Sequence, residues 1–170
     1  FNIKHFAMLN KIIITAFVIV SIASCKGKDA FNYSQDFVKK EKSLIPAITE
    51  TEQNVKRYMD KEQYDSIAIA GEKMEVLVNS KIKEVRDEPA PSVKEGENFK
   101  EACVRYFEFI KSMYTGYKNY GKATTKEQRS AEMEKLLEIT SKKKDAINAI
   151  QQAQQKYADA NGFRLENSKN

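Results

Sequence analysis

Apolar residues recur at spacings of three and four along most of the chain after Ser34, which is the periodicity of one face of an α-helix. A convincing alternation of apolar and polar residues, the pattern of a half-buried strand, occurs nowhere in the sequence. We therefore expect an all-α fold. Breaks in the pattern predict four amphipathic helices, and the short connections between them favour an up-down antiparallel four-helix bundle over residues 32–170.

The first helix is expected to begin near Asn32 or Ser34 and to end near Asp60. Pro46 interrupts its apolar face, and an internal proline removes one backbone hydrogen bond and usually kinks a helix. We expect one continuous kinked helix, because Phe37 keeps phase with the apolar positions Leu44 and Ile48; the alternative is a separate short helix before Ile45.

Three stretches with turn or loop signals separate the remaining helices. Asp60 followed by Gln63 has the spacing of a capping box, which predicts a turn and a second helix up to Asp87. We expect Gly71, in the middle of that helix, to accommodate a large side chain from a neighbouring helix. Pro89, Pro91 and Gly96 mark the clearest loop of the chain, at residues 87–96.

The third helix is expected from about Glu97 to Tyr120, with Gly121 as its C-cap. Thr124 or Thr125 should cap a fourth helix, with Glu127 and Gln128 as capping-box partners. That helix should end at Asn161-Gly162, after which Phe163 and Leu165 should fold back onto the end of the bundle.

The segment before the bundle has the three parts of a secretory signal peptide. Lys11 provides a positive start, Ile12 to Ile22 form a short apolar run, and small residues follow directly before Cys25. The run is well below the roughly 20 residues that a permanent membrane span needs. We expect the signal to start at Met8, with residues 1–7 upstream of it, and residues 1–24 to be removed.

Ile22-Ala23-Ser24-Cys25 resembles the lipobox of bacterial lipoproteins. The resemblance implies that the thiol of Cys25 receives a diacylglyceryl group, that the chain is cleaved before Cys25, and that several acyl chains then anchor it durably in a membrane. Residues 25–31 would be the lipidated cysteine and a short polar tether. The alternative is an ordinary cleaved signal whose mature chain happens to begin with Cys.

Composition argues against several functions of the mature chain. Loss of Lys4 and Lys11 lowers the net charge from +5 to +3, which is too mild to indicate nucleic-acid binding. The only histidine, His5, also lies before the cleavage point, and the only cysteine besides Cys25 is Cys103, which we expect to be a buried thiol. We therefore expect no enzyme activity, no metal and no cofactor.

Carboxylates near the core-facing positions of the helices are Glu41, Glu101 and Glu108. Ferritin-like di-iron sites need Glu-x-x-His pairs in addition to such glutamates, and these pairs are missing. We interpret the three residues as glutamates at the edge of the core, held by lysines.

The third helix carries more aromatic residues than one buried face can hold. Some tyrosines should therefore lie at the rim, where they could contact a partner protein, a sugar or an apolar ligand. The candidate binding residues are Tyr114, Tyr117 and Tyr120. The alternative is that these tyrosines fill a core that lacks tryptophan, with their hydroxyls reaching water at its edge.

Two stretches, Phe99–Phe109 and Gln151–Phe163, resemble segments of a family of helical surface lipoproteins from Leptospira and Bacteroidetes-type bacteria. The resemblance implies a location in the cell envelope, in the outer membrane, and no known activity. Exported members often have an acidic stretch after the cysteine. Here Lys26-Gly27-Lys28-Asp29 follows it, which favours the periplasmic side over the cell surface.

These observations together predict a membrane-anchored lipoprotein whose non-catalytic bundle binds an envelope protein or another partner protein. The alternative is a ligand-binding or sensory bundle that holds a small apolar or aromatic molecule in a tyrosine-lined cavity between its helices.

Overall fold

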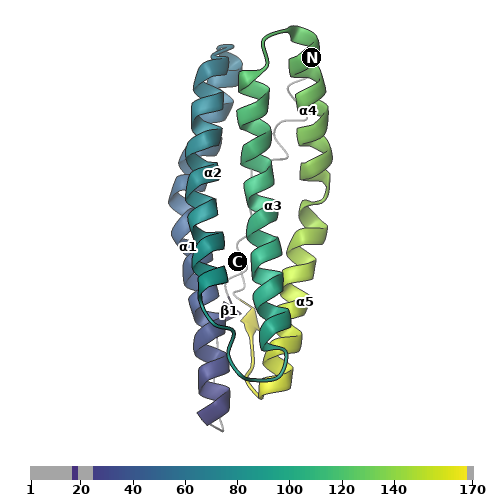
Figure 1. Ribbon diagram of the computed structural model, residues 1–170. Helices are drawn as coiled ribbons and strands as arrows, with labels where there is room; N and C mark the ends of the chain where they lie inside the picture. The colour runs from purple at the N-terminus through teal and green to yellow at the C-terminus, as the bar shows by residue number, and fades with distance from the viewer. Residues whose placement is uncertain (1–16, 19–24, 168–170) are drawn as a thin grey trace.

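The computed structural model describes residues 17–18 and 25–167, and within them the chain is an all-α bundle (Figure 1). Its helices and its two very short strands are β1 (Phe17–Val18), α1 (Cys25–Asp60), α2 (Tyr64–Asp87), α3 (Gly96–Lys122), α4 (Lys126–Ser141), α5 (Lys143–Asn161) and β2 (Glu166–Asn167). α4 and α5 follow each other in one arm that is interrupted at Lys142, so the bundle has four arms. The predicted all-α four-helix bundle is confirmed.

The four arms alternate in direction, as expected for an up-down bundle (Figure 1). α2 and α3 make the most extensive contact, α1 packs against α2 and α5, and α3 packs against both α4 and α5. β1 pairs with β2 in antiparallel register, with Phe17 opposite Asn167. This pairing is too short to leave an alternating pattern in the sequence.

α1 is continuous through Pro46, as predicted, but it begins earlier than predicted. The expected tether at residues 25–31 forms the first turns of α1, and Ala30 is already fully buried. The ring of Phe31 meets the ring of Phe163 edge-on at 6.1 Å, so the returning C-terminal segment covers the start of the helix. The prediction of a separate tether is therefore wrong.

The turn between α1 and α2 lies where the sequence predicted it, but it is closed differently. Asp60 is the last residue of α1, and the N-cap of α2 is Gln63, whose side chain makes no capping bond. The backbone N–H of Gln63 donates to the carbonyl of Tyr58 at 2.8 Å, and Glu62 adopts a left-handed φ of 54°. This is a helix C-terminal motif in which glutamate stands where glycine is usual, which explains why the turn lacked a glycine signal.

The interface between α2 and α3 is a close approach of two backbones. A Cβ atom on Gly71 would lie 2.6 Å from the backbone nitrogen of Lys118, and one on Gly121 would lie 2.4 Å from that of Ala68. Gly71 therefore faces main chain rather than the large side chain that we expected. Gly121 lies inside α3, which continues to Lys122, so its prediction as a C-cap is wrong.

The fourth arm begins and ends as predicted. Thr125 and Gln128 form the expected capping box at the start of α4, and Gly162 ends α5 with a left-handed φ of 71°. Phe163 is buried, and Leu165 packs against the core. The break at Lys142 was not predicted.

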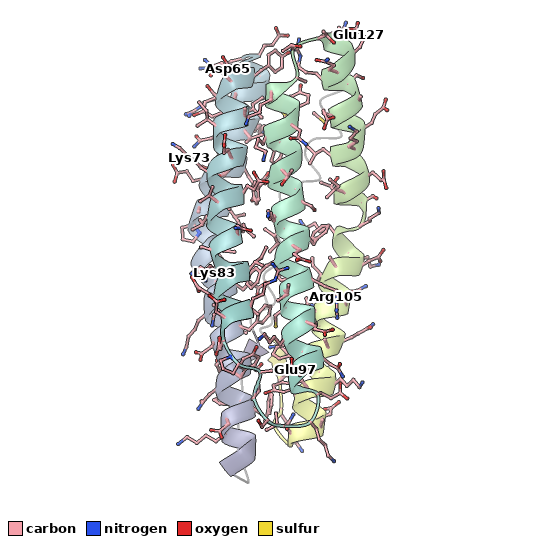
Figure 2. The ribbon with its side chains drawn as sticks, viewed as in Figure 1. Asp65, Lys73, Lys83, Glu97, Arg105 and Glu127 are labelled. Carbon is pink, nitrogen blue, oxygen red and sulfur yellow. The ribbon has the colours of Figure 1, made fainter. Side chains whose placement is uncertain are left out.

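Charged side chains project outward from all four arms, for example Lys73 and Lys83 on α2 and Arg105 on α3 (Figure 2). Among the described helices, none combines the length and the apolar character that crossing a membrane would require.

Candidate functional site

The two ends of the bundle differ in their chemistry. One end carries Cys25, the loop 88–95 between α2 and α3, and Gly162 after α5, and we call it the anchor end after the predicted lipidation of Cys25. The opposite end, which we call the tip, carries the turns 61–63 and 123–125. The lipobox residues 22–24 and the side chain of Cys25 lie outside the described part of the chain. Lipidation of Cys25 therefore stays a prediction, and the structure adds that its backbone starts α1.

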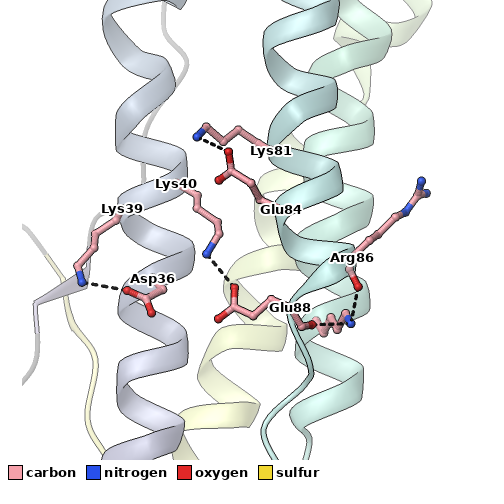
Figure 3. Close-up of polar contacts among 8 residues, drawn as sticks. Asp36, Lys39, Lys40, Lys81, Glu84, Arg86 and Glu88 are labelled. Atoms are coloured by element: carbon pink, nitrogen blue, oxygen red, sulfur yellow. Dashed lines mark hydrogen bonds and ion pairs between the residues drawn. The ribbon is translucent and has the colours of Figure 1, made fainter.

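Ion pairs and hydrogen bonds to main-chain carbonyls hold the anchor end together (Figure 3). Lys40 of α1 pairs with Glu88, just after α2, at 2.9 Å. Lys100 of α3 donates to the carbonyl oxygens of Arg86 and Glu88 at 3.0 and 2.7 Å. A cation at the C-terminus of a helix satisfies carbonyls that lack intrahelical partners and interacts favourably with the helix dipole. These contacts join three arms at the anchor end.

An open pocket of about 680 Å³ lies beside the loop at this end. Its lining combines loop residues with the ends of α1, α3 and α5, namely Gly27, Ala90, Pro91, Ser92, Val93, Lys94, Glu97, Ala160 and Asn161. No tyrosine lines this pocket, so it is not the tyrosine-lined cavity that the alternative function requires.

Tyr114 and Tyr117, two of the candidate binding residues, lie in the core, and neither ring is exposed. The hydroxyl of Tyr114 donates to Oε1 of Glu52 at 3.4 Å, and that of Tyr117 donates to Oε2 at 3.1 Å. Burial raises the pKa of both phenols above their ordinary value. The structure therefore places these two tyrosines as core residues that bind a carboxylate of α1, and not at the rim.

Glu52 is the functional candidate that sequence reasoning missed. Burial raises the pKa of its carboxyl to about 7, although the hydrogen bonds from Tyr117 and Tyr114 and the charge of Lys143 act in the opposite direction. The residue lies eleven positions after Glu41, which is about three helical turns, so both carboxyls share one face of α1. That spacing was the available signal.

Glu41 occupies an equivalent position nearer the anchor end. Its side chain is buried, and Oε1 accepts a hydrogen bond of 2.8 Å from the hydroxyl of Tyr106. Burial raises the pKa of Glu41 to about 7, while the bond from Tyr106 and the charge of Lys42 lower it. The expectation that Glu41 lies near the core is confirmed, but a tyrosine rather than a lysine holds it.

The other two glutamates singled out from the sequence lie on the surface. Glu101 pairs with Arg105 at 3.3 Å, and Glu108 pairs with Arg86. Both side chains are exposed, so they are not core-edge glutamates held by lysines. Among the described residues, no group of three or more His, Cys, Asp or Glu side chains is arranged to hold a metal ion.

Tyr120, the third candidate, belongs to a partly exposed cluster at the tip. Its ring meets that of Tyr64 edge-on at 6.0 Å, and the guanidinium of Arg129 lies 4.2 Å above the centre of the Tyr64 ring. Arg129 also donates to the carbonyl of Ala123 at 2.7 Å, which fixes its position. Across the turn, Arg57 lies over the ring of Tyr58 at 5.4 Å. We use the name tip cluster for the side chains of Arg57, Tyr58, Met59, Tyr64, Tyr120 and Arg129.

The tip cluster contains the residue types that are enriched at the centres of protein interfaces, which are tyrosine, arginine and methionine. Cation–π contacts hold two of its rings, which lowers the entropy cost of ordering them on binding. The arrangement offers aromatic ring faces and guanidinium groups for contact with another protein surface.

No protein-family model, no curated protein and no solved structure matches this chain.

Proposed function

We propose that this chain is a bacterial lipoprotein, anchored through acyl chains on Cys25, whose non-catalytic bundle presents its tip to a partner protein of the cell envelope. The observation that carries the proposal is the course of α1. This single helix of 36 residues begins at Cys25 and ends at the tip, so it spans about 54 Å at 1.5 Å per residue. An anchor at its first residue would hold the tip cluster roughly that far from the lipid surface.

The placement of the reactive side chains supports a non-catalytic role. Cys103 is a free, buried thiol, and burial raises its pKa well above the ordinary value, so the nucleophilic thiolate is disfavoured. Glu41 and Glu52 are bonded to tyrosines inside the bundle. Their carboxyls are therefore engaged in packing the bundle and are not presented to a substrate in an open cleft.

Lys26 and Lys28 directly after Cys25 support the periplasmic side of the outer membrane over the cell surface. Cleavage before Cys25 would also remove β1, so β2 would lose its partner strand on maturation. Phe163 and Leu165, which pack on the core, would then still hold the segment after α5 near the anchor end.

The alternative, in which the bundle holds a small apolar or aromatic molecule, receives less support. It rests on a tyrosine-lined cavity, whereas Tyr114 and Tyr117 pack in the core against Glu52. The pocket at the anchor end is lined by other residues. We therefore favour partner binding at the tip.

Site-specific photo-crosslinking in intact cells tests this proposal. A photoreactive amino acid at Lys61, in the turn beside the tip cluster, should give a discrete adduct with one protein. The same group at Lys83, which is also exposed to solvent on α2 but lies away from the tip, is the control and should not give that adduct. Tyr64→Ala should weaken the Lys61 adduct. Equal adducts from both positions, or none from Lys61, would contradict docking at the tip.

A further inference from the structure

α4 buries fewer side chains than any other helix of the bundle. Leu136 is its one buried side chain, at 1% exposure, whereas α5 buries four. Met133 and Ile139 are only partly buried where they pack against the core, and Leu137 is 40% exposed. Elements with few buried apolar side chains open at a lower free-energy cost than the rest of a fold. The core therefore holds α4 less firmly than the other helices.

Leu136 makes a close contact with α3 at a glycine. A Cβ atom on Gly116 would lie 2.8 Å from Cδ1 of Leu136, which is closer than two carbon atoms pack. Gly116 is itself buried. The leucine side chain therefore fills a hollow that exists because residue 116 has no side chain. This one contact is the main apolar attachment of α4 to α3.

Arg129 provides the second attachment, at the start of α4. Its guanidinium donates to the carbonyl of Ala123 at 2.7 Å and lies 4.2 Å above the centre of the Tyr64 ring. It therefore ties α4 to the end of α3 and to α2. Among the described residues, the other side-chain hydrogen bonds and ion pairs of α4 stay between Thr124 and Lys142. These local bonds support the helix itself and do not attach it to the bundle.

α4 and α5 differ in how many neighbours hold them. In the described part of the chain α4 packs extensively on α3, whereas α1 packs on α2 and α5 and makes no extensive contact with α4. α5 is held from two sides, because Gln154 donates to Ser34 of α1 at 3.0 Å and Tyr157 stacks on Phe99 of α3 at 4.7 Å. The break at Lys142 thus separates a weakly held segment from a firmly held one.

We propose that α4 is a hinged arm, which opens from α3 as a unit by pivoting at Lys142 while α1, α2, α3 and α5 stay folded. Opening withdraws Leu136 from Gly116, breaks the two contacts of Arg129 and exposes the surface of α3 that α4 covers. The closed form is the one in the structure, and the open form is a minor population. This inference does not depend on the proposed lipoprotein function.

Native-state amide hydrogen exchange of the full chain, in low concentrations of urea, tests the arm. Amides of residues 130–141 should exchange through one common opening and be at least about tenfold less protected than those of residues 150–158. Their protection should also depend less on urea, because opening one helix exposes less surface than unfolding the whole bundle. Equal protection and equal urea dependence in α4 and α5 would overturn the proposal. This comparison needs no substitution.

Two substitutions of buried residues separate the opening of α4 from global unfolding. Leu136→Ala should speed exchange in α4 by at least about tenfold, because the closed form loses its main apolar contact. Ile82→Ala, at a buried position of α2 near the anchor end, should speed exchange of the best protected amides of α2 and α3. It should leave α4 unchanged, since Ile82 stays packed when α4 opens.

Leu137→Ala is the matched control for Leu136→Ala, because Leu137 is the next residue of α4 but is partly exposed to solvent. It should have little effect on exchange in α4. An α4 whose exchange responds equally to Leu136→Ala and Ile82→Ala, or does not respond to Leu136→Ala, would contradict a separate opening of this arm.

Discussion

The burial of Glu41 shows how a single residue contributes to the pH dependence of this fold. The folded-state pKa of Glu41, about 7, lies above the ordinary 4.5 because of burial. The folded chain therefore binds an extra proton between these values, and the contribution of Glu41 to stability is fully present below pH 4.5 and is lost as the pH rises to about 7. The shift corresponds to roughly 3 kcal/mol of unfolding free energy at 1.36 kcal/mol per unit.

We expect Glu41→Gln to remove that part of the pH dependence. The wild type should be less stable at pH 8 than at pH 5, and the variant should show a difference smaller by about 2.5 kcal/mol, because glutamine accepts the Tyr106 bond without ionising. Urea unfolding at both pH values measures this. Glu101→Gln, at an exposed position, is the control and should behave as the wild type. An identical pH dependence in Glu41→Gln would refute the assignment.

For single residues, the sequence could predict which helix face they occupy but not which residues they bond to. Glu41 falls on the apolar face of α1, so its burial could be expected, and Glu52 shares that face. Which tyrosines meet these carboxyls depends on the rotation and height of α3 relative to α1. Neither quantity can be obtained from the pattern of one helix. The sequence therefore predicts all three tyrosines at the rim, whereas in the structure Tyr114 and Tyr117 are buried and Tyr120 is partly exposed.

Among the helices, the α2–α3 interface is the most demanding contact. A Cβ atom at position 121 would lie 2.4 Å from the backbone nitrogen of Ala68, and main chain cannot yield as a flexible side chain can. We expect Gly121→Ala to destabilise the fold by about 1–3 kcal/mol, despite the better helix propensity of alanine. Asn119→Ala, at an exposed position of the same helix, is the control and should be nearly neutral. Thermal unfolding compares them, and a neutral or stabilising Gly121→Ala would disprove the close approach.

Most helix boundaries could be predicted because local signals mark them. Pro89, Pro91 and Gly96 delimit a loop, Thr125 and Gln128 form a capping box, and Gly162 ends α5. The early start of α1 could not be predicted, because it depends on the contact of Phe31 with Phe163, which is distant in the sequence. Nor could the break at Lys142, where no proline or glycine interrupts the helical pattern.

For the whole molecule, one helix links the predicted lipid anchor to the tip cluster. The four-arm architecture follows from periodicity and connection length, which the sequence contains in full. Function does not follow in the same way, because the tip cluster combines side chains from α1, α2, α3 and α4 that only the fold brings together. Partner binding at the tip depends on the proposed anchor, because without it the tip would not be held at a defined height above a membrane.

The most direct test of that account is mass spectrometry of the mature amino terminus, combined with cell fractionation and protease treatment of intact cells, for the native gene and a Cys25→Ala version. We predict an acylated Cys25 in the membrane fraction, a bundle that resists protease until cells are lysed, and loss of anchoring in Cys25→Ala. A bundle shaved from intact cells would move the tip to the cell surface. An unmodified Cys25, or native protein recovered without membrane, would contradict the central claim.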